Sequence, residues 1–400
     1  VRLYTRSGVE EMDVPLSQKH ADFQARLRKV VQEKIAPGVE EIDRTNRFPW
    51  EWIDILRKEG FIGIMVPEEY GGKGADFTMA SILAEESARV SGGLGMVLCT
   101  NNITPLLYIE HGTPEQKEKY LRRLAGGALA NMVAVSEPTG GTDMAAMLTE
   151  ARRDGDHWVL NGDKYYIEPA EVADIVHIFA KTSPEKGGRG ISGFIVEKET
   201  PGYSVGKVAD PLGMRGAGLA EIYLKDARVP AENLLGDEGG GIRVVRSGLD
   251  AAAAVAGLPL GLAQGALDLS LDYARTRTAF GKPLAGHQAL QFMLVDMAME
   301  VEASRHYIFE CCALANQGER DVRLFQMSSA FANKVALDVS EKAVEVFSGR
   351  AVLEWTHPAC RFWRDARANV GAGGTQNLKR LLVGKMLFSE RFPAPGRGVE

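Results

Sequence analysis

The sequence predicts an α+β multidomain fold: an N-terminal helical domain, a middle β-barrel or β-sandwich domain, and a C-terminal four-helix bundle. Helical spacing of apolar residues comes first along the chain, strand-like alternation follows, and long helical stretches return to the end. We place the boundaries at 1–14 (a tail), 15–130 (helices), 131–236 (strands) and 237–400 (helices).

In the first helical region, apolar residues recur at three- and four-residue spacing. Phe23, Leu27, Val30 and Ile35 follow this pattern, and Pro37-Gly38 ends it. Later helices have similar punctuation, such as the opening proline and closing glycine in PWEWIDILRKEG. The segment from 15 to 130 is therefore predicted to be all-helical.

The middle region alternates apolar and polar residues and contains Asp-Gly, Asn-Gly and Pro-Gly turns. The predicted strands lie in MVAVS, TEARRDGDHWVLNGDKYYI, ADIVHIFAKT, ISGFIVEKE, YSVGKV and AEIYLKDARVP. So many short strands in so short a stretch favour a barrel or sandwich, because closure removes exposed edges. A GxGxxG string in this region precedes a strand instead of a helix, so it is not a dinucleotide-binding fingerprint.

The last region predicts long helices at about 241–276, 287–317, 322–347 and 374–387. Their connections are short relative to their lengths. Short connections between long helices predict antiparallel packing as a bundle.

Composition and charge exclude several classes of protein. The chain is 45% hydrophobic with a formal net charge of −6, which argues against a nucleic-acid or anionic-membrane surface. No apolar run approaches the ~20 residues of a membrane span, and the first residues lack the apolar core of a signal peptide. The four cysteines show no CxxC spacing, so neither a metal site nor a disulfide framework is expected. We expect a cytoplasmic protein.

The segment VSEPTGGTD at 135–143 combines hydroxyls, glycines and acids directly after an apolar run. Such a segment can lay backbone amides and small hydroxyls against a flat, phosphate-bearing cofactor. The sequence Tyr165-Tyr166-Ile167-Glu168 follows it and is expected to form part of the same cradle.

Several motifs share an order and spacing along essentially the whole chain. They are PEEYGGKGAD (67–76), GTPEQKEKYL (112–121), VSEPTGGTD (135–143), NGDKYYI (161–167), MRGAGLAEIYLKDARVP (214–230), YARTRTAFGKPLAGHQALQFMLVDMA (273–298) and RDARANVGAGGTQNLKR (364–380). Together they resemble the acyl-CoA dehydrogenase family. The resemblance implies the same three-part fold, bound FAD and a homotetramer or dimer.

The resemblance also assigns cofactor contacts near the middle domain. Ser136 matches the hydroxyl that touches the flavin ring, and Thr142 matches the hydroxyl on the FAD pyrophosphate. A buried diphosphate needs such donors. Tyr166, Ile167 and Glu168 stand where the family has Trp-Ile-Thr, so a carboxylate replaces the hydroxyl beside flavin N5.

Other matched positions lie in the C-terminal region. Arg277 and Phe280 match the R-x-x-F-G segment that reaches the FAD of a neighbouring subunit. Gln288 and Gln291 match its FAD-facing amides. Thr375 and Asn377 stand at the start of the last cofactor-contacting helix, where a helix N-terminus suits phosphate.

The family's catalytic glutamate is missing. In most relatives it lies just before the Gly-Thr of the last motif, which is Gly373 here. The alternative position, on the first helix of the bundle, is Ala251 or Ala252. Glycine and alanine side chains cannot accept a proton, so both usual positions lack a base.

Four interpretations remain open for the base. Asp250 is one residue from the alternative position, and Glu168 lies at the flavin position. A loop acid such as Glu69 is a third candidate. The fourth interpretation is altered chemistry without a base.

The predicted function is an FAD-dependent oxidoreductase that desaturates an acyl thioester at Cα–Cβ with a non-standard base. The thioester is acyl-CoA or bound to a carrier protein, and the electron acceptor is electron-transfer flavoprotein or oxygen. One alternative is a flavin monooxygenase or oxidase on the same fold. The other is a catalytically silent FAD-binding subunit of a hetero-oligomer.

Overall fold

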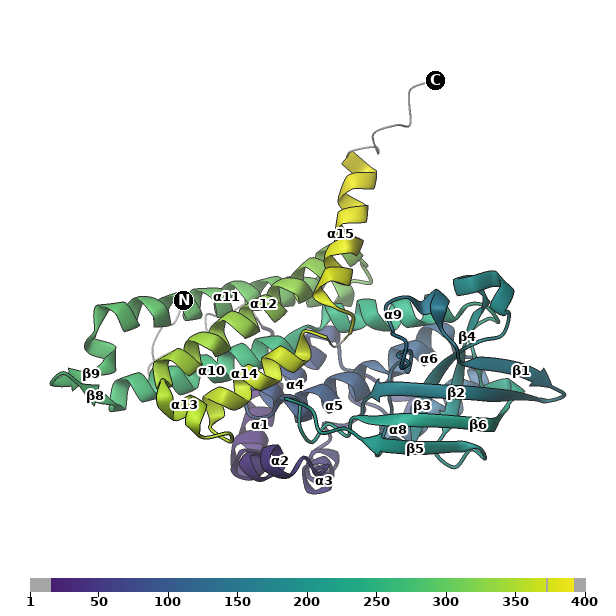
Figure 1. Cartoon of the computed structure of the whole chain (residues 1–400), viewed down its shortest axis with the longest axis horizontal. Helices are drawn as coiled ribbons and strands as arrows, with labels where there is room; N and C mark the ends of the chain where they lie inside the picture. Colours follow the sequence, from purple (N-terminus) through teal and green to yellow (C-terminus); the bar gives the residue numbers. More distant parts are fainter. Residues whose placement is uncertain (1–15, 372, 392–400) are drawn as a thin grey trace.

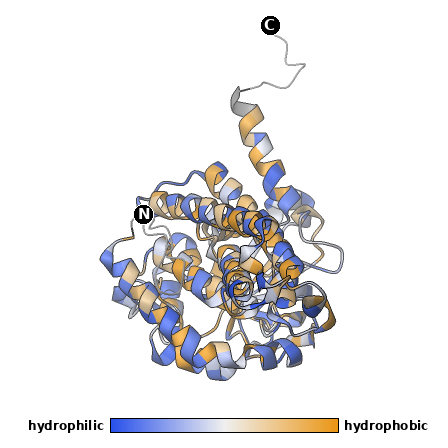
Figure 2. Ribbon diagram, turned by 90° about the vertical axis from the view of Figure 1, so that its left-hand side faces the viewer, coloured by the Kyte–Doolittle hydropathy of each residue, from blue (hydrophilic) through white to orange (hydrophobic). Residues whose placement is uncertain are grey.

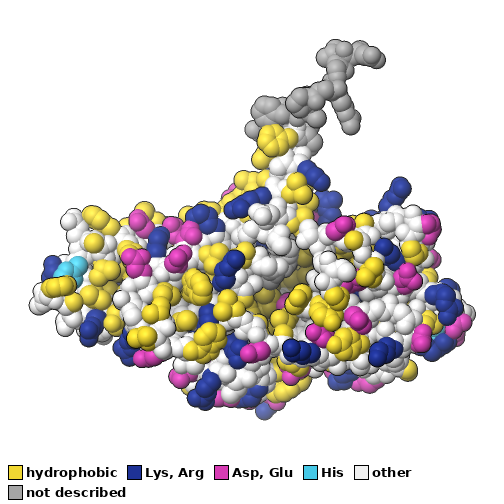
Figure 3. Space-filling model, in the orientation of Figure 1, with side chains coloured by type: hydrophobic (Ala, Val, Ile, Leu, Met, Phe, Trp, Pro, Cys, Tyr) yellow, Lys and Arg dark blue, Asp and Glu magenta, His cyan; other side chains and the backbone are white. Residues whose placement is uncertain are grey.

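The predicted order of helices, sheet and helices is confirmed (Figure 1). The computed structural model describes residues 16–371 and 373–391. The expected tail at 1–14 lies outside this range. Charged side chains of both signs are interspersed over the face shown in Figure 3.

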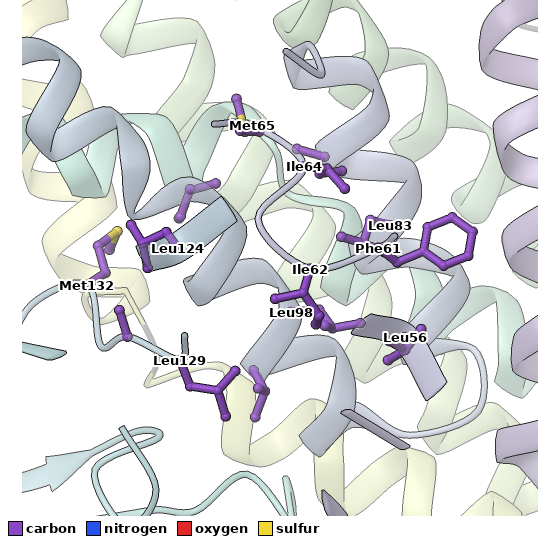
Figure 4. Close-up of a cluster of buried hydrophobic side chains, with 14 of the residues drawn as sticks. Leu56, Phe61, Ile62, Ile64, Met65, Leu83, Leu98, Leu124, Leu129 and Met132 are labelled. Atoms are coloured by element: carbon purple, nitrogen blue, oxygen red, sulfur yellow. The ribbon is translucent and has the colours of Figure 1, made fainter. Parts of the chain in front are cut away.

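The N-terminal helices pack around one apolar core. Their bounds are α1 Gln18–Val30, α2 Val39–Thr45, α3 Trp50–Lys58, α4 Phe77–Ala88, α5 Gly92–Ile103, α6 Pro105–His111, α7 Pro114–Gln116 and α8 Arg122–Ala125. Serine or aspartate side chains accept backbone N–H bonds at the starts of α1, α4 and α5, as N-caps do. Figure 4 shows part of the core, where Phe61, Leu83 and Leu98 meet.

The middle domain is a seven-stranded sheet in the order β5-β6-β2-β1-β3-β4-β7. Its strands are β1 Glu150–Asp154, β2 His157–Ile167, β3 Ile175–Lys181, β4 Ile191–Glu197, β5 Tyr203–Val208, β6 Ala220–Pro230 and β7 Leu234–Leu235. The two halves of the sheet meet only at the pair Glu150–Lys181. Apolar side chains from both halves, including Trp158, Phe194 and Ile222, form one buried cluster between them.

The segment MVAVS forms no continuous strand, which differs from the sequence-based expectation. It touches β3 through an isolated bridge at Ala134, and Ala130, just before the segment, makes another. The peptide N–H of Ala134 donates to the carbonyl of His177 at 2.8 Å, but no ladder develops. The segment therefore serves as a link from the helical domain into the sheet.

The C-terminal region contains more helices than the sequence predicted. They are α9 Gly241–Ala254, α10 Gly257–Thr276, α11 Gln288–Asn316, α12 Val322–Phe347, α13 Gly349–Leu353, α14 Pro358–Asn369 and α15 Gln376–Arg391. The expected helix at 241–276 is broken after α9. Gly257 and Gly261 lie so close to α4 that a Cβ would collide with the carbonyls of Ser81 and Glu85. The break lets α10 start in register for this close packing.

The fourth helix of the bundle is α14, whereas the sequence predicts the segment 374–387 for that position. The helix α14 packs with α10 and α12, while α15 projects from the body (Figures 1 and 2). The span Gly241–Thr276 is long and apolar enough to cross a membrane, but 83% of its most apolar window is buried inside the protein. That is the environment of a core helix.

Candidate functional site: a cofactor shelf at the end of β2

A buried ion pair fixes the loop at 136–149 to β2. The ammonium of Lys164 donates to Glu137 Oε1 at 2.8 Å, and both side chains are almost fully buried. Glu137 also accepts from the peptide N–H groups of Leu148 and Thr149, at 2.6 and 3.0 Å. A paired and hydrogen-bonded carboxylate of this kind holds its loop in one conformation.

The loop and the end of β2 together form a shelf, which we call the cofactor shelf: Ser136, Gly141, Thr142 and Tyr166. The peptide N–H of Tyr165 donates to the carbonyl of Ser136 at 2.8 Å, which joins the two segments. Ser136 is half-buried, Thr142 is exposed, and Tyr166 is 69% exposed with φ at +60°.

The shelf fits a flat ligand with phosphate groups. A Cβ at Gly141 would stand 2.5 Å from Ser136 Oγ, so only glycine lets the loop backbone approach the serine hydroxyl this closely. The exposed Thr142 hydroxyl and Tyr166 ring offer a donor and an aromatic face. Next to the shelf, Asn131 Oδ1 is buried and has no hydrogen-bond partner among the described residues. Ile167 differs, because its side chain is buried in the β-domain cluster and only its backbone is available to a cofactor.

Glu168 lies at the inner edge of this shelf. Asn131 Nδ2 donates to its backbone carbonyl at 2.8 Å, and its peptide bond to Pro169 is cis. Burial raises the pKa of its carboxyl to about 7. Burial, with the charge of Glu168 as a second cause, raises the pKa of the Cys99 thiol of α5 to about 12. Glu168 is therefore a partly buried acid whose pKa lies near neutral pH.

Asp250 occupies a different environment. Its side chain is 16% exposed, accepts from Gln326 Nε2 of α12 at 3.2 Å and lies 3.8 Å from Arg246. Burial raises the pKa of Asp250, opposed by Gln326 and Arg246. Gly248, two positions earlier, packs against Met132 at the start of the β-domain.

A helix turns by about 100° per residue, so Asp250 lies on the opposite face of α9 from Gly248. Ala252, one turn beyond Gly248, shares its face and packs on the cluster that contains Met132. Ala251 is buried. The structure thus separates Asp250 from the side of α9 that meets the β-domain and leaves a methyl group there.

The other expected base positions offer no proton acceptor near the shelf. Gly373 has φ at +61° and is exposed, and a Cβ there would meet nothing within 4 Å. Glu69 is exposed on a surface turn, and its carbonyl accepts from Arg122.

The residues matched in the C-terminal region lie far from the shelf. Arg277 and Phe280 sit on the β-hairpin of β8 (Thr278–Ala279) and β9 (Lys282–Pro283), at the end of the bundle opposite the sheet (Figure 1). Phe280 is 97% exposed with φ at +51°. Gln288 and Gln291 are exposed on the first turn of α11. One chain cannot bring this hairpin and its own shelf to the same ligand.

Thr375 and Asn377 are exposed at the start of α15. The Thr375 hydroxyl accepts from the peptide N–H of Leu378 at 3.2 Å and so caps the helix. The helix is tied to α12 where Lys379 Nζ donates to Ser329 Oγ at 2.9 Å.

Sequence reasoning missed two residues that build the shelf. Lys164 appears in the sequence analysis only as part of the NGDKYYI motif. A lysine at an inward-facing position of an alternating strand is a signal for a buried ion pair. Asn131 gave no signal, because its role depends on the approach of two segments distant in sequence. Its carbonyl contacts His177 Nδ1 at 2.5 Å, and its side chain supports Glu168.

Three family models match the chain in order. They are the acyl-CoA dehydrogenase N-terminal domain (residues 17–128), middle domain (132–227) and C-terminal domain (239–388). The chain belongs to the acyl-CoA dehydrogenase family. It is therefore an FAD-dependent flavoenzyme of the oxidoreductases that act on CH–CH groups.

Relatives cover nearly the whole chain. An acyl-CoA dehydrogenase of Bacillus subtilis strain 168 is 36% identical over 377 residues, 93% of this chain and 99% of that one. The butyryl-CoA dehydrogenase of Megasphaera elsdenii superposes with a TM-score of 0.90 at 32% identity, covering 94% and 100% of the two chains. The prolyl acyl carrier protein oxidase AnaB gives a TM-score of 0.88 at 25% identity, covering 93% and 99%.

Proposed function

We propose that the protein desaturates an acyl thioester at Cα–Cβ with Glu168 as the proton acceptor. The observation that carries this proposal is the partly buried Glu168 carboxyl at the inner edge of the cofactor shelf, together with methyl or hydrogen at the two usual base positions. Bound FAD supplies the acceptor for the hydride that leaves Cβ.

The residues of the chain have separate roles in this proposal. The Ser136 hydroxyl, Thr142 hydroxyl and Tyr166 ring hold the cofactor against the shelf. The Glu168 carboxylate takes the proton from Cα as the hydride leaves Cβ, so a double bond forms and Glu168 becomes neutral. A carboxyl with a pKa near 7 suits this task, because both protonation states are accessible at neutral pH.

The substrate is proposed to be an acyl-CoA or an acyl group on a carrier protein. Ala252 presents only a methyl group on the face of α9 that packs on the apolar cluster near Met132, whereas Ala253 and Ala254 are buried against Cys311 and Phe325. The short side chain of Ala252 would leave space for an acyl or pantetheine chain on that face. Electron-transfer flavoprotein or oxygen would reoxidise the flavin.

We also propose that the active form is a homotetramer or dimer in the cytoplasm. The separation of the Arg277–Phe280 hairpin from the shelf supports an assembly, since the hairpin can then reach the cofactor of a second chain. Thr375, Asn377, Gln288 and Gln291 would complete that contact.

A second candidate is a flavin monooxygenase or oxidase. The absence of a side chain that can accept a proton at Gly373 and Ala252 favours it, because oxygen chemistry on reduced flavin requires no α-proton acceptor. A catalytically silent FAD-binding subunit is the remaining alternative.

An anaerobic titration with acyl thioesters tests the proposal. We expect loss of the oxidised flavin absorbance with one class of acyl-CoA or acyl carrier protein. Glu168→Gln should slow this reduction at least about a hundred-fold. The matched control is Asp250→Asn, which removes the acid on the face of α9 that points away from the β-domain; its reduction rate should stay within a few-fold of the wild-type rate.

Each other outcome has a distinct meaning. Equal slowing in both variants would reject Glu168 as the specific base. Flavin that no thioester reduces, but that turns over with NAD(P)H and oxygen, would favour the monooxygenase. A yellow protein inert in both assays would indicate the silent subunit.

A further inference from the structure

Asn131 bridges a gap in the β-domain next to the cofactor shelf. Glu168 follows the end of β2, and β1 separates that strand from β3 in the sheet. Among the described strands, the two halves of the sheet are paired only at Glu150–Lys181. Asn131 makes a second connection, because its backbone bonds to β3 and its side-chain Nδ2 donates to the Glu168 carbonyl at 2.8 Å.

Both backbone polar groups of Asn131 are held by β3. Its peptide N–H donates to the carbonyl of Ile175 at 3.0 Å, and its carbonyl contacts His177 Nδ1 at 2.5 Å. Asn131 is also buried, with 3% of its surface exposed. A residue locked by packing and by bonds at both backbone groups presents its side chain from a fixed position. The amide of Asn131 therefore meets Glu168 from one direction.

The His177 ring makes its contact with Asn131 in one protonation state. The ring is fully buried, and burial lowers its pKa to about 4, opposed by the bond to Asn131, so it is uncharged at neutral pH. A carbonyl oxygen only accepts, so Nδ1 carries the proton and donates to Asn131. Nε2 must then accept, and it lies 2.8 Å from the Tyr108 hydroxyl, which donates to it.

Tyr108 holds the other side of the His177 ring. Its side chain on α6 is fully buried, stacks on Tyr120 with ring centroids 5.4 Å apart, and meets the imidazole edge-to-face at 5.3 Å. The imidazole cannot turn away from Asn131 without losing its partner on Tyr108 and this aromatic contact. The direction of the Nδ1 donor is therefore fixed from both sides.

We propose that His177 is a positioning residue for Glu168. Its ring holds the carbonyl of Asn131, and the Asn131 amide holds the Glu168 carbonyl. Loss of the ring lets the end of β2 shift and moves the Glu168 carboxyl out of its partly buried place beside the shelf. A shift of about 1 Å at a reacting group slows catalysis about a hundred-fold. The catalytic consequence rests on the proposed function of Glu168, whereas the positional effect does not.

Infrared titration of the oxidised, FAD-loaded protein follows Glu168 without a thioester. The C=O band of its neutral carboxyl is identified by its loss in Glu168→Gln, and in the wild type it should disappear as the pH rises through about 7. His177→Phe removes the donor to Asn131. The midpoint should then move towards the ordinary value of 4.5, because a displaced carboxyl is better solvated. Cys99, whose pKa responds to the Glu168 charge, remains a neutral thiol throughout, because that pKa is about 12.

Two matched variants separate positioning from stability. The Nδ2 of asparagine can take the place of histidine Nδ1, so His177→Asn should keep the wild-type midpoint. Tyr120→Phe removes a hydroxyl that bonds to Glu197 and Asn233 in the same aromatic stack. It should lower the thermal midpoint and leave the Glu168 titration unchanged. Flavin reduction by a thioester active with the wild type should fall at least about ten-fold in His177→Phe, with the half-saturating concentration within a few-fold.

Three results overturn the inference: a wild-type midpoint already near 4.5, a folded His177→Phe variant with the wild-type midpoint, or equal shifts in His177→Phe, His177→Asn and Tyr120→Phe. If His177→Phe does not fold, Asn131→Leu removes the amide through which the ring acts, and an unchanged midpoint there also rejects the inference. Wild-type flavin reduction in Glu168→Gln would instead reject the proposed base, while the infrared midpoints still decide the role of His177.

Discussion

Lys164 Nζ lies 2.8 Å from Glu137 Oε1 in a pair that is 0% and 2% exposed. The pair joins β2 to the loop that carries Ser136 and Thr142. It keeps its geometry through bonds from Thr149 and Leu148 to the same carboxylate. The loop that carries Ser136 and Thr142 is therefore held in place by an ion pair that lies outside the shelf.

Removing one partner of this pair should destabilise the fold. Lys164→Met leaves the Glu137 charge buried without its cation, and we expect a loss of about 3–5 kcal/mol in the free energy of unfolding. Retained FAD should fall as well. The double variant Lys164→Met/Glu137→Gln should lose less than the single variant, as measured by urea denaturation. Equal losses would contradict a coupled pair.

Flavin reduction should depend on the protonation of Glu168. Its carboxyl accepts a proton only when ionised, so the reduction rate should rise with pH through about 7 and level off above. Stopped-flow absorbance across pH 5.5–9 measures this profile. Glu168→Gln should slow the step at least about a hundred-fold and remove this dependence on pH. A wild-type rate that is flat across this range would reject Glu168 as the base.

The same pKa predicts how stability changes with pH. The folded protein holds the Glu168 proton up to about pH 7, whereas the ordinary value is 4.5. The contribution is therefore fully present below about pH 4.5 and is lost as the pH rises through about 7. Thermal midpoints of the wild type should fall relative to Glu168→Gln over this interval. A constant difference would show that burial does not shift this carboxyl.

A glutamate restored at the alternative family position should take over the proton transfer. Ala252 is only partly buried on the face of α9 that meets the β-domain. We expect Ala252→Glu to accelerate flavin reduction at least ten-fold in a Glu168→Gln background. Asp250→Glu in that background, which lengthens an acid on the opposite face, is the matched control and should not.

Ser348 gives a prediction about stability alone. It is exposed with φ +54° and ψ −137°, a conformation that glycine adopts without a Cβ clash. The sequence here, EVFSG, replaces the glycine of the family's QxxGG segment. Ser348→Gly should therefore stabilise the fold by about 1 kcal/mol in urea denaturation. A destabilised variant would contradict strain at this position.

The order of domains could be predicted from the sequence because it depends on local periodicity. The helix α12 was predicted at its observed bounds, Val322–Phe347, since an apolar stripe and flanking turns define it. The break between α9 and α10 differs from the expected continuous helix, although Pro259 is a local signal for it, because proline has no N–H to donate to the carbonyl of Val255. The tertiary structure adds the close packing of Gly257 on α4.

The sequence by itself determined the family and the cofactor, because both depend on which residues stand in its motifs. Only the tertiary structure distinguished Asp250 from Glu168. Both are acids beside a family position, and their chemistry is the same in an unfolded chain. Folding turns Asp250 toward Gln326 and Arg246 and partly buries Glu168, whose pKa rises to about 7. Solvation and neighbouring charge, which set the ability of a carboxyl to accept a proton, exist only once the elements are packed.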